Sequence, residues 1–156
     1  MKMAVILFTI LLSLSGCATY GPGPTDIEYS QAINKLPIAK ISVYTMKASW
    51  FPNVMLGDVM SFHSPSVAGT LFLSQEQMVF ATFDSETNIF LQSFSSPYSD
   101  MRWITIKKHG VSRIIRIQTN NNVHSFVYSS GSKNNGEDAD KDEIMQFLLD
   151  KFKKAS

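Results

Sequence analysis

The side chains that most often carry out chemistry in proteins occur in this sequence, but not in catalytic or metal-binding patterns. His63, His109 and His124 are far apart, and neither a second cysteine nor a metal-ligand spacing accompanies them. The chain has no Gly-x-Ser-x-Gly elbow and no glycine-rich phosphate loop ahead of a helix. The sequence therefore predicts a protein that is not an enzyme, with no metal site and no cofactor.

Three aspartates near the C-terminus, Asp138, Asp140 and Asp142, begin like a calcium-binding loop. In such a loop a glycine follows the third acid and a glutamate ends the loop, whereas this chain has Glu143 and Leu149 at those positions. Helix capping accounts for the acids better, because acidic side chains stabilise the first turn of a helix.

The single cysteine, Cys17, has the clearest chemical role. It follows a basic start at Lys2, an apolar stretch over 4–14 and small residues, which are the parts of an export signal. The apolar stretch is too short to span a bilayer, which takes roughly 20 residues. The segment Leu14-Ser15-Gly16-Cys17 resembles the lipobox of bacterial lipoproteins, which implies cleavage between Gly16 and Cys17 and lipidation of the cysteine. An incidental cysteine beside a signal peptide that is cut elsewhere is the alternative.

The same resemblance implies a location. A triacylated cysteine anchors a protein by itself, because stable anchoring takes more than one acyl chain. Ala18 follows the cysteine, and in Gram-negative lipoproteins a residue other than Asp at this position favours the outer membrane. We therefore expect a lipid-anchored protein of the bacterial cell envelope, on the periplasmic face of the outer membrane.

Length and charge limit what the anchored part can be. Removing residues 1–16 from the 156 leaves 140, enough for one domain with its own core. Loss of Lys2 reduces the 14 basic residues to 13, which balance the 13 acidic ones. A nucleic-acid partner is therefore not expected, because the positive charge that such binding needs is missing. With one cysteine, no disulfide can form within the chain.

The chain divides into three parts. Residues 1–16 are the expected signal peptide, and 17–37 are a lipidated N-terminus and flexible tether rich in glycine and proline. A short helical turn is expected over 30–36, with Pro37 ending it. Residues 38–156 form the expected domain, with a C-terminal helix over 140–153.

Short β-type runs separated by turn residues fill most of this domain. The short turns favour antiparallel hairpins. Ile104 and Ile106 alternate with polar residues, as do Ile115 and Ile117, so each strand should turn one face inward and one toward water. The seven expected strands are 38–46, 70–74, 78–83, 88–94, 102–107, 112–118 and 123–128.

The C-terminal helix carries clear start and packing signals. Asp140 and Glu143 have the spacing of a capping box. Helical spacing aligns four apolar side chains into one stripe, which should pack on the sheet: Ile144, Phe147, Leu148 and Phe152. A helix lying on a membrane surface is the alternative.

Seven antiparallel strands followed by one helix resemble the order of a pleckstrin-homology-like (PH-like) domain. The segments Gly69-Thr70-Leu71-Phe72-Leu73-Ser74 and Met78-Val79-Phe80 resemble a hairpin of GRAM domains, and Pro97-Tyr98-Ser99-Asp100-Met101 resembles the segment before their fifth strand. The resemblance implies a mainly β fold, a PH-like (GRAM-like) seven-stranded antiparallel barrel or sandwich capped by an α-helix. Another small β-barrel or sandwich is the alternative.

Two groups of residues are candidates for a binding surface. The apolar stretch 49–66 includes Trp50, Phe51 and Met55, and it either covers a barrel opening as core or binds an apolar partner or lipid. Lys107, Lys108 and Arg113 could meet acidic partners, or they keep exposed strands soluble.

These observations favour a lipid-anchored, non-catalytic module that binds another envelope protein. The alternative is binding of a lipid or other apolar ligand at the barrel mouth. Phosphoinositide-binding members of the fold carry clustered lysines and arginines after the first strand. The stretch 47–66 has one lysine, Lys47, and one carboxylate, Asp58, so the sequence does not favour phosphoinositide binding.

Overall fold

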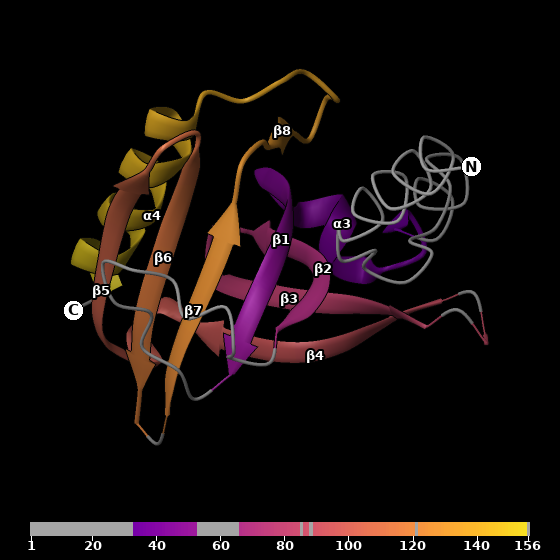
Figure 1. The fold of residues 1–156 in the computed structure, drawn as a ribbon, viewed down its shortest axis with the longest axis horizontal. Coiled ribbons are helices and arrows are strands. Elements are labelled where there is room, and N and C mark those ends of the chain that lie inside the picture. Colours follow the sequence, from indigo (N-terminus) through magenta and orange to yellow (C-terminus); the bar gives the residue numbers. More distant parts are fainter. Residues whose placement is uncertain (1–32, 53–65, 85, 88, 121, 156) are drawn as a thin grey trace, which may run out of the picture.

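The computed structural model describes residues 33–52, 66–84, 86–87, 89–120 and 122–155. The expected signal peptide, Cys17, and Met55 lie outside the described residues. The elements follow in the order α3 (Pro37–Ile41), β1 (Tyr44–Pro52), β2 (Val67–Leu73), β3 (Gln77–Asp84), β4 (Ile89–Pro97), η1 (Tyr98–Asp100), β5 (Met101–His109), β6 (Ser112–Thr119), β7 (Val123–Tyr128), β8 (Ser132–Lys133) and α4 (Lys141–Ala155) (Figure 1).

Within the described residues, one antiparallel sheet joins the strands in the order β4-β3-β2-β1-β7-β6-β5, with β8 paired to β1. β1 is its centre, because residues 44–50 pair with β2 while residues 48–52 pair with β7. Figure 1 shows β3 and β4 running across the direction of β5, β6 and β7, so the sheet bends strongly around β1. Among the described residues β4 and β5 do not pair with each other, which leaves the sheet open.

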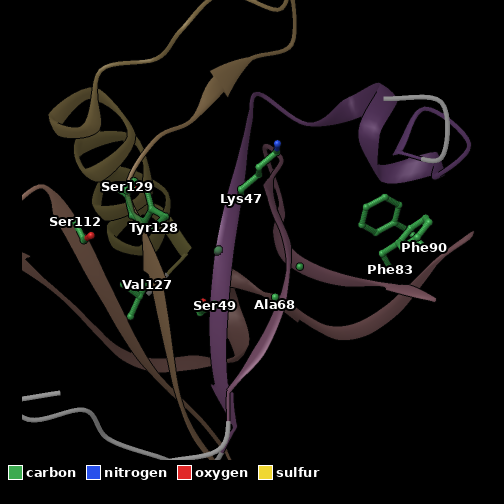
Figure 2. Close-up of a pocket in the computed structure, with 11 residues that line it drawn as sticks. Lys47, Ser49, Ala68, Phe83, Phe90, Ser112, Val127, Tyr128 and Ser129 are labelled. Carbon is green, nitrogen blue, oxygen red and sulfur yellow. The ribbon is translucent and has the colours of Figure 1, made fainter. Parts of the chain in front are cut away.

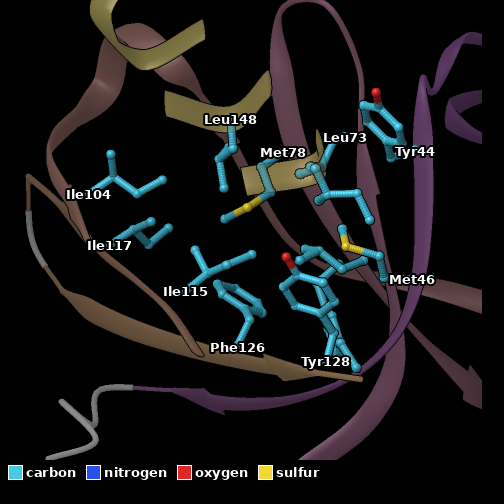
Figure 3. Close-up of a cluster of buried hydrophobic side chains, with 14 of the residues drawn as sticks. Tyr44, Met46, Leu73, Met78, Ile104, Ile115, Ile117, Phe126, Tyr128 and Leu148 are labelled. Atoms are coloured by element: carbon cyan, nitrogen blue, oxygen red, sulfur yellow. The ribbon is translucent and has the colours of Figure 1, made fainter. Parts of the chain in front are cut away.

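The main core lies between the two halves of this bent sheet, under α4. Side chains from both halves converge there with Leu148 of the helix (Figure 3). Its largest fully buried members are Tyr128, Phe80, Phe126, Met46, Leu71, Leu73, Met78, Ile115 and Ile117. The expected inward direction of Ile115 and Ile117 is confirmed.

Six of the seven expected strands are confirmed to within a few residues, and the first is wrong. The described part of the expected turn, residues 33–36, is confirmed, because the Leu36 N–H donates a hydrogen bond to the Ile33 carbonyl oxygen at 3.1 Å. Pro37 then begins helix α3, because its fixed φ suits the first helical position, where no N–H is required. The strand then starts at Tyr44. Ile38 is buried by packing on the outer face of β2 and β3, where Ile33 and Leu36 also contact the sheet.

The outer face of the sheet is more buried than alternation alone predicts. Phe72, Val79, Ala81 and Phe90 form a second cluster there with Ile38. A third cluster joins Phe51 to Ile114 and Val127. Arg116, expected to face water, is only 7% exposed, so the expectation of a solvated outer face of β6 is wrong.

Helix α4 packs on the sheet as expected, with Ile144 and Leu148 fully buried. Asp140 caps it, because its Oδ1 accepts hydrogen bonds from the backbone N–H groups of Asp142 (2.7 Å) and Glu143 (3.2 Å). The other half of the expected capping box is replaced: the Glu143 carboxylate accepts a hydrogen bond from the Tyr44 hydroxyl. Within the described chain, no helix is long and apolar enough to cross a membrane.

Candidate binding groove

A groove of about 400 Å³ crosses β1 on the outer face of the sheet. Strands from both halves of the sheet contribute to it, so residues far apart in the sequence meet there (Figure 2). The described lining residues are Lys47, Ala48, Ser49, Ala68, Gly69, Phe83, Phe90, Ser112, Val127, Tyr128 and Ser129.

Small side chains form the middle of the groove. Ser49 of β1 pairs with Ala68 of β2, and Ala48 pairs with Gly69. A Cβ atom on Gly69 would lie 2.3 Å from the carbonyl oxygen of Ala81 and 2.6 Å from Cζ of Phe80. Glycine is therefore required at this position by the close approach of β3. The added Cβ would meet Phe80 of the main core, so the shallow middle of the groove comes from the small side chains of Ser49 and Ala68.

Aromatic rings make one wall of the groove. Phe83 and Phe90 are register partners in the β3–β4 hairpin, with ring centroids 5.3 Å apart and an interplanar angle of 62°. This edge-to-face arrangement is a favourable one for aromatic pairs. Val127 lines the other side and packs on the cluster of Phe51 and Ile114. Both sides therefore offer apolar contact to a bound molecule.

The described polar side chains of the groove are three serines, one lysine and Tyr128, whose side chain is buried and whose hydroxyl donates a hydrogen bond to the carbonyl oxygen of Lys141. Ser49, Ser112 and Ser129 supply hydroxyl groups, and Lys47 is the one charged residue among the described lining residues. These residues include no histidine, carboxylate or thiol that could act as acid, base or nucleophile. Among the described residues no group of His, Cys, Asp or Glu could hold a metal ion. The chemistry that this set supports is apolar binding with a few polar contacts.

The β1 backbone in the middle of the groove has little hydrogen-bonding capacity to offer a ligand. Ala48 and Ser49 are paired on one side with β2 and on the other with β7, whereas the pairing of β2 with β3 covers residues 70–73 and does not include Ala68 or Gly69. In a strand that is paired on both sides, the sheet itself uses the N–H and C=O groups. A peptide in the groove could therefore not add a strand at Ala48 and Ser49.

The structure places Trp50, one of the predicted surface residues, against the core. Its ring lies 5.5 Å from that of Phe80 and stacks on Phe126 at 6.3 Å. Its Nε1–H donates a hydrogen bond to Nδ1 of His124 at 3.4 Å. His124 is itself buried, and burial lowers the pKa of its imidazole below the usual value. Trp50 therefore packs against the core, which agrees with the interpretation of this stretch as core and not with its interpretation as a binding surface.

Phe51 points to the other face of β1, as the next residue along a strand must. It is 6% exposed and packs against Ile114 and Val127. Trp50 and Phe51 therefore do not form one surface together, and Met55 lies outside the described residues.

The structure brings Lys108 and Arg113 together as register partners of β5 and β6. Both contact the Asp142 carboxylate of α4, at 3.1 Å from Lys108 Nζ and 3.2 Å from Arg113 Nη2. The hydrogen bond from Lys108 and then that from Arg113 hold the pKa of Asp142 below its usual value. These two basic residues thus connect the strands to the helix, while Lys107 is exposed on β5. None of the three lines the groove.

Sequence reasoning missed the groove, because none of its residues is unusual alone. The nearest signal was the pair of phenylalanines, Phe83 and Phe90, on either side of a turn. Only the pairing of β1 with both β2 and β7 shows that Lys47 and Ala68 lie on the same surface as Val127.

No protein-family model and no curated protein matches this chain. Solved structures that it resembles include the C-terminal domain of an unknown protein from Leishmania infantum, with 15% identity, a TM-score of 0.41, and 69% of this chain and 80% of the other covered. Another is the Slm1-PH domain in complex with inositol-4-phosphate, with 12% identity, a TM-score of 0.38, and 74% and 96% covered. A third is autoinhibited Vav1, with 8% identity, a TM-score of 0.40, and 83% of this chain but 21% of Vav1 covered.

The fold is PH-like. The strand order of the described chain and its C-terminal helix, packed on the core between the two halves of the sheet, are the arrangement expected from the sequence. A fold of this kind hosts many unrelated functions, so function must be argued from the groove.

Proposed function

We propose that this protein is an exported, lipid-anchored, non-catalytic binding protein of the bacterial envelope, and that it binds an apolar ligand. The observation that carries the proposal is the groove across β1, with its apolar walls and shallow centre. Its volume of about 400 Å³ lies within the roughly 300–1,000 Å³ range of small-molecule sites. The site differs from the barrel mouth expected from the sequence, because Trp50 packs among core rings.

The anchor in this proposal depends on the lipobox-like segment that ends at Cys17. Replacing the cysteine, Cys17→Ala, should abolish metabolic labelling with a radioactive fatty acid and release the protein from the membrane fraction. If Cys17→Ala protein still sediments with membranes, the domain itself binds lipid bilayers and the anchor is not the main attachment.

An apolar small molecule fits the groove better than a segment of another protein. A polypeptide brings an N–H and a C=O at almost every residue, and burying these groups without partners is costly. The groove offers few partners, because Ala48 and Ser49 of β1 beneath it are paired on both sides within the sheet. Its described polar side chains are Lys47, three serines and Tyr128, and the Tyr128 hydroxyl already donates to the carbonyl oxygen of Lys141. A hydrocarbon chain has no such requirement.

Binding can be tested with N-phenyl-1-naphthylamine, a neutral apolar dye whose fluorescence rises in apolar sites. The protein is the mature chain 17–156 with Cys17→Ala, so that no attached acyl chain competes. Filling the groove with Ala68→Trp should abolish saturable dye binding. Thr105→Trp introduces the same side chain at an exposed position of β5; it is the control and should leave binding intact. Equal dye binding by wild type and Ala68→Trp would contradict the proposed site.

Binding to another envelope protein is a second candidate, and the edge strand β4 favours it. Ile89 and Leu91 of this strand are 40% and 47% exposed, and its outer edge has no partner strand among the described residues. An unpaired edge with exposed apolar side chains is suited to pairing with a strand of a partner. Co-purification in mild detergent decides between the candidates: a stoichiometric protein lost on Leu91→Lys supports this one, and an extractable small molecule supports the groove.

A further inference from the structure

We propose that Asn135 is a site of spontaneous deamidation, in which the backbone nitrogen of Gly136 attacks the Asn135 side-chain amide and converts the residue to aspartate or isoaspartate. The inference concerns the turn after β8 and depends neither on the proposed function nor on the groove. It rests on the exposure of Asn135, on the glycine that follows it, and on the hydrogen bonds of the turn that holds them.

Asn135 and Gly136 lie in a turn at the surface, in the segment that connects β8 to α4 (Figure 1). Both residues are exposed, and the turn closes where Ser132 and Asp138 form an isolated bridge. A side chain on the residue after an asparagine would hinder the approach of its backbone nitrogen, and glycine has none. A Cβ atom placed on Gly136 would have no atom within 4 Å apart from those of its chain neighbours. The approach is therefore open on the side of the described residues.

The side chain of Asn135 is already turned toward the backbone that follows it. Its Oδ1 accepts a hydrogen bond from the N–H of Glu137 at 3.1 Å, so Gly136 lies between the two ends of this contact. The same N–H polarises the carbonyl at which the attack occurs, and it would stabilise the negative charge that develops on Oδ1. The turn thus holds the amide on the side of its nucleophile and activates it.

One hydrogen bond opposes the reaction and should make it slow. The Gly136 N–H donates to the carbonyl oxygen of Lys133 at 3.0 Å, and the nitrogen must lose this proton before it can attack. The turn must therefore open first, which costs little free energy at an exposed loop. The φ of Gly136, 86°, is one that glycine leaves and regains easily. We therefore expect slower deamidation in the folded protein than in a peptide of the same sequence.

The reaction consumes water and releases ammonia, with no change of oxidation state. Solvent base removes the Gly136 N–H proton, the nitrogen forms a bond to Cγ of Asn135, and Nδ2 takes up a proton and leaves as ammonia. Water then opens the resulting succinimide ring at either of its carbonyl carbons. Opening at Cγ gives aspartate with the original backbone. Opening at the main-chain carbon gives isoaspartate, in which the chain runs through Cγ.

Either product should weaken the attachment of β8 to the sheet. Both add a negative charge beside Glu137 and Asp138, and isoaspartate also lengthens the backbone of the turn. The hydrogen bond from the Lys133 N–H to the Glu137 carbonyl oxygen, at 2.8 Å, spans this turn. Lys133 also pairs with Tyr44 of β1 and contacts the Glu143 carboxylate of α4 at 3.1 Å. A disturbed turn therefore reaches the contact between β1 and α4.

The test is incubation of the folded protein at mildly alkaline pH, followed by proteolysis and mass spectrometry. Peptides that contain Asn135 should gain the mass difference between an amide and a carboxylic acid, with aspartate and isoaspartate as separate products. Asn134 is an internal control in the same exposed turn, because asparagine and not glycine follows it, and it should keep its amide. A synthetic peptide of residues 130–140, incubated in parallel, gives the rate without the hydrogen bond to Lys133.

Asn135→Gln should abolish the reaction, because its amide carbon lies one methylene further along the side chain. Asn134→Gln is the matched control and should deamidate at Asn135 as the wild type does. After incubation the wild type should melt at a lower temperature, whereas Asn135→Gln should not. An intact amide at Asn135 of the folded protein when the peptide has fully reacted would overturn the inference. Equal deamidation of Asn134 and Asn135 would overturn it too, because the glycine and the Glu137 contact would then not direct the reaction.

Discussion

The Tyr44 hydroxyl at the start of β1 donates a hydrogen bond to Oε1 of Glu143 in α4, at 2.7 Å and across 99 positions of the sequence. Lys133 of β8 lies 3.1 Å from the same carboxylate oxygen. Burial, and then the hydrogen bond and charge of Glu143, raise the pKa of Tyr44 to about 12. In turn, the hydrogen bonds from Tyr44 and Lys133 lower the pKa of Glu143. The central strand, the short strand β8 and the terminal helix thus meet at one carboxylate.

Removing this hydroxyl with Tyr44→Phe should lower the free energy of unfolding by about 1 kcal/mol, the usual net value of a hydrogen bond. The aromatic ring and its contact with Phe147, at a centroid distance of 5.1 Å, remain. Urea unfolding followed by circular dichroism measures the change. Glu143→Gln is a milder change at the same contact, because the amide oxygen can still accept from Tyr44. A larger loss in Glu143→Gln than in Tyr44→Phe would show that the Lys133 pair matters more than this hydrogen bond.

The N-terminal cap of α4 gives a second prediction. Asp140→Ala leaves the N–H groups of Asp142 and Glu143 without their side-chain acceptor and should cost about 1 kcal/mol of unfolding free energy. Asp140→Asn keeps a capping oxygen and should recover most of that loss. Asp138→Ala removes an equal charge two residues earlier and is the control. Equal losses in Asp138→Ala and Asp140→Ala would indicate a general charge effect in place of capping.

Features that depend on residues adjacent in the sequence could be predicted from the sequence alone. Alternation located β5 and β6, and the acids before Ile144 located the start of α4. The sequence failed over residues 38–41, where a strand was expected and helix α3 is present, because that segment depends on Ile38 packing against a distant part of the chain.

Features that depend on pairing between distant strands could not be predicted. The groove exists because β1 changes partner from β2 to β7 along its length. The burial of Arg116 and the contact between Phe51 and Ile114 likewise depend on which surfaces face each other. The sequence shows Lys108 and Arg113 as basic residues, but it indicates Asp142 only as an acid in the first turn of α4. The ion pairs between them become evident only in the folded structure.

Gly69 should tolerate no side chain, although it lines an open groove. In Gly69→Ala the new Cβ would lie 2.3 Å from the Ala81 carbonyl oxygen, which belongs to backbone and cannot swing away. Separating β2 from β3 to relieve this contact should cost about 1–3 kcal/mol, seen as a lower melting temperature. Ala68→Ser, at the adjacent exposed position, is the control and should melt close to wild type. An unchanged melting temperature for Gly69→Ala would mean that β2 and β3 can separate freely.

Trp50 should contribute to stability and not to ligand binding. Trp50→Ala removes ring contacts with Phe80, Phe94, Phe126 and His124 and should cost about 3 kcal/mol of unfolding free energy. The groove is on the opposite face of β1, so the folded variant should bind N-phenyl-1-naphthylamine with unchanged affinity. Trp50→Phe keeps an aromatic ring and should be less destabilised. Loss of dye binding in a folded Trp50→Phe variant would restore the interpretation of Trp50 as a binding residue.

His124 should make the domain less stable in mild acid. Burial lowers the pKa of this imidazole in the folded chain from 6.5, so as pH falls below about 6.5 the unfolded chain takes up a proton before the folded one does. The unfolded state then binds more protons, and the free energy of unfolding decreases with falling pH by up to about 1.4 kcal/mol per unit. Protonation would also place a charge beside the Phe94 ring, 4.7 Å away, and remove the acceptor of the Trp50 N–H.

Urea unfolding at about pH 7.5 and pH 5.5 isolates this effect. The carboxylates with lowered pKa values, among them Asp142 and Glu143, stay ionised throughout that range and lose their stabilising effect only in stronger acid. His124→Gln cannot titrate, so its unfolding free energy should fall less between the two pH values than that of the wild type. His109→Gln, at the exposed end of β5, should behave as the wild type does. The same acid sensitivity in His124→Gln would assign the titration to another group.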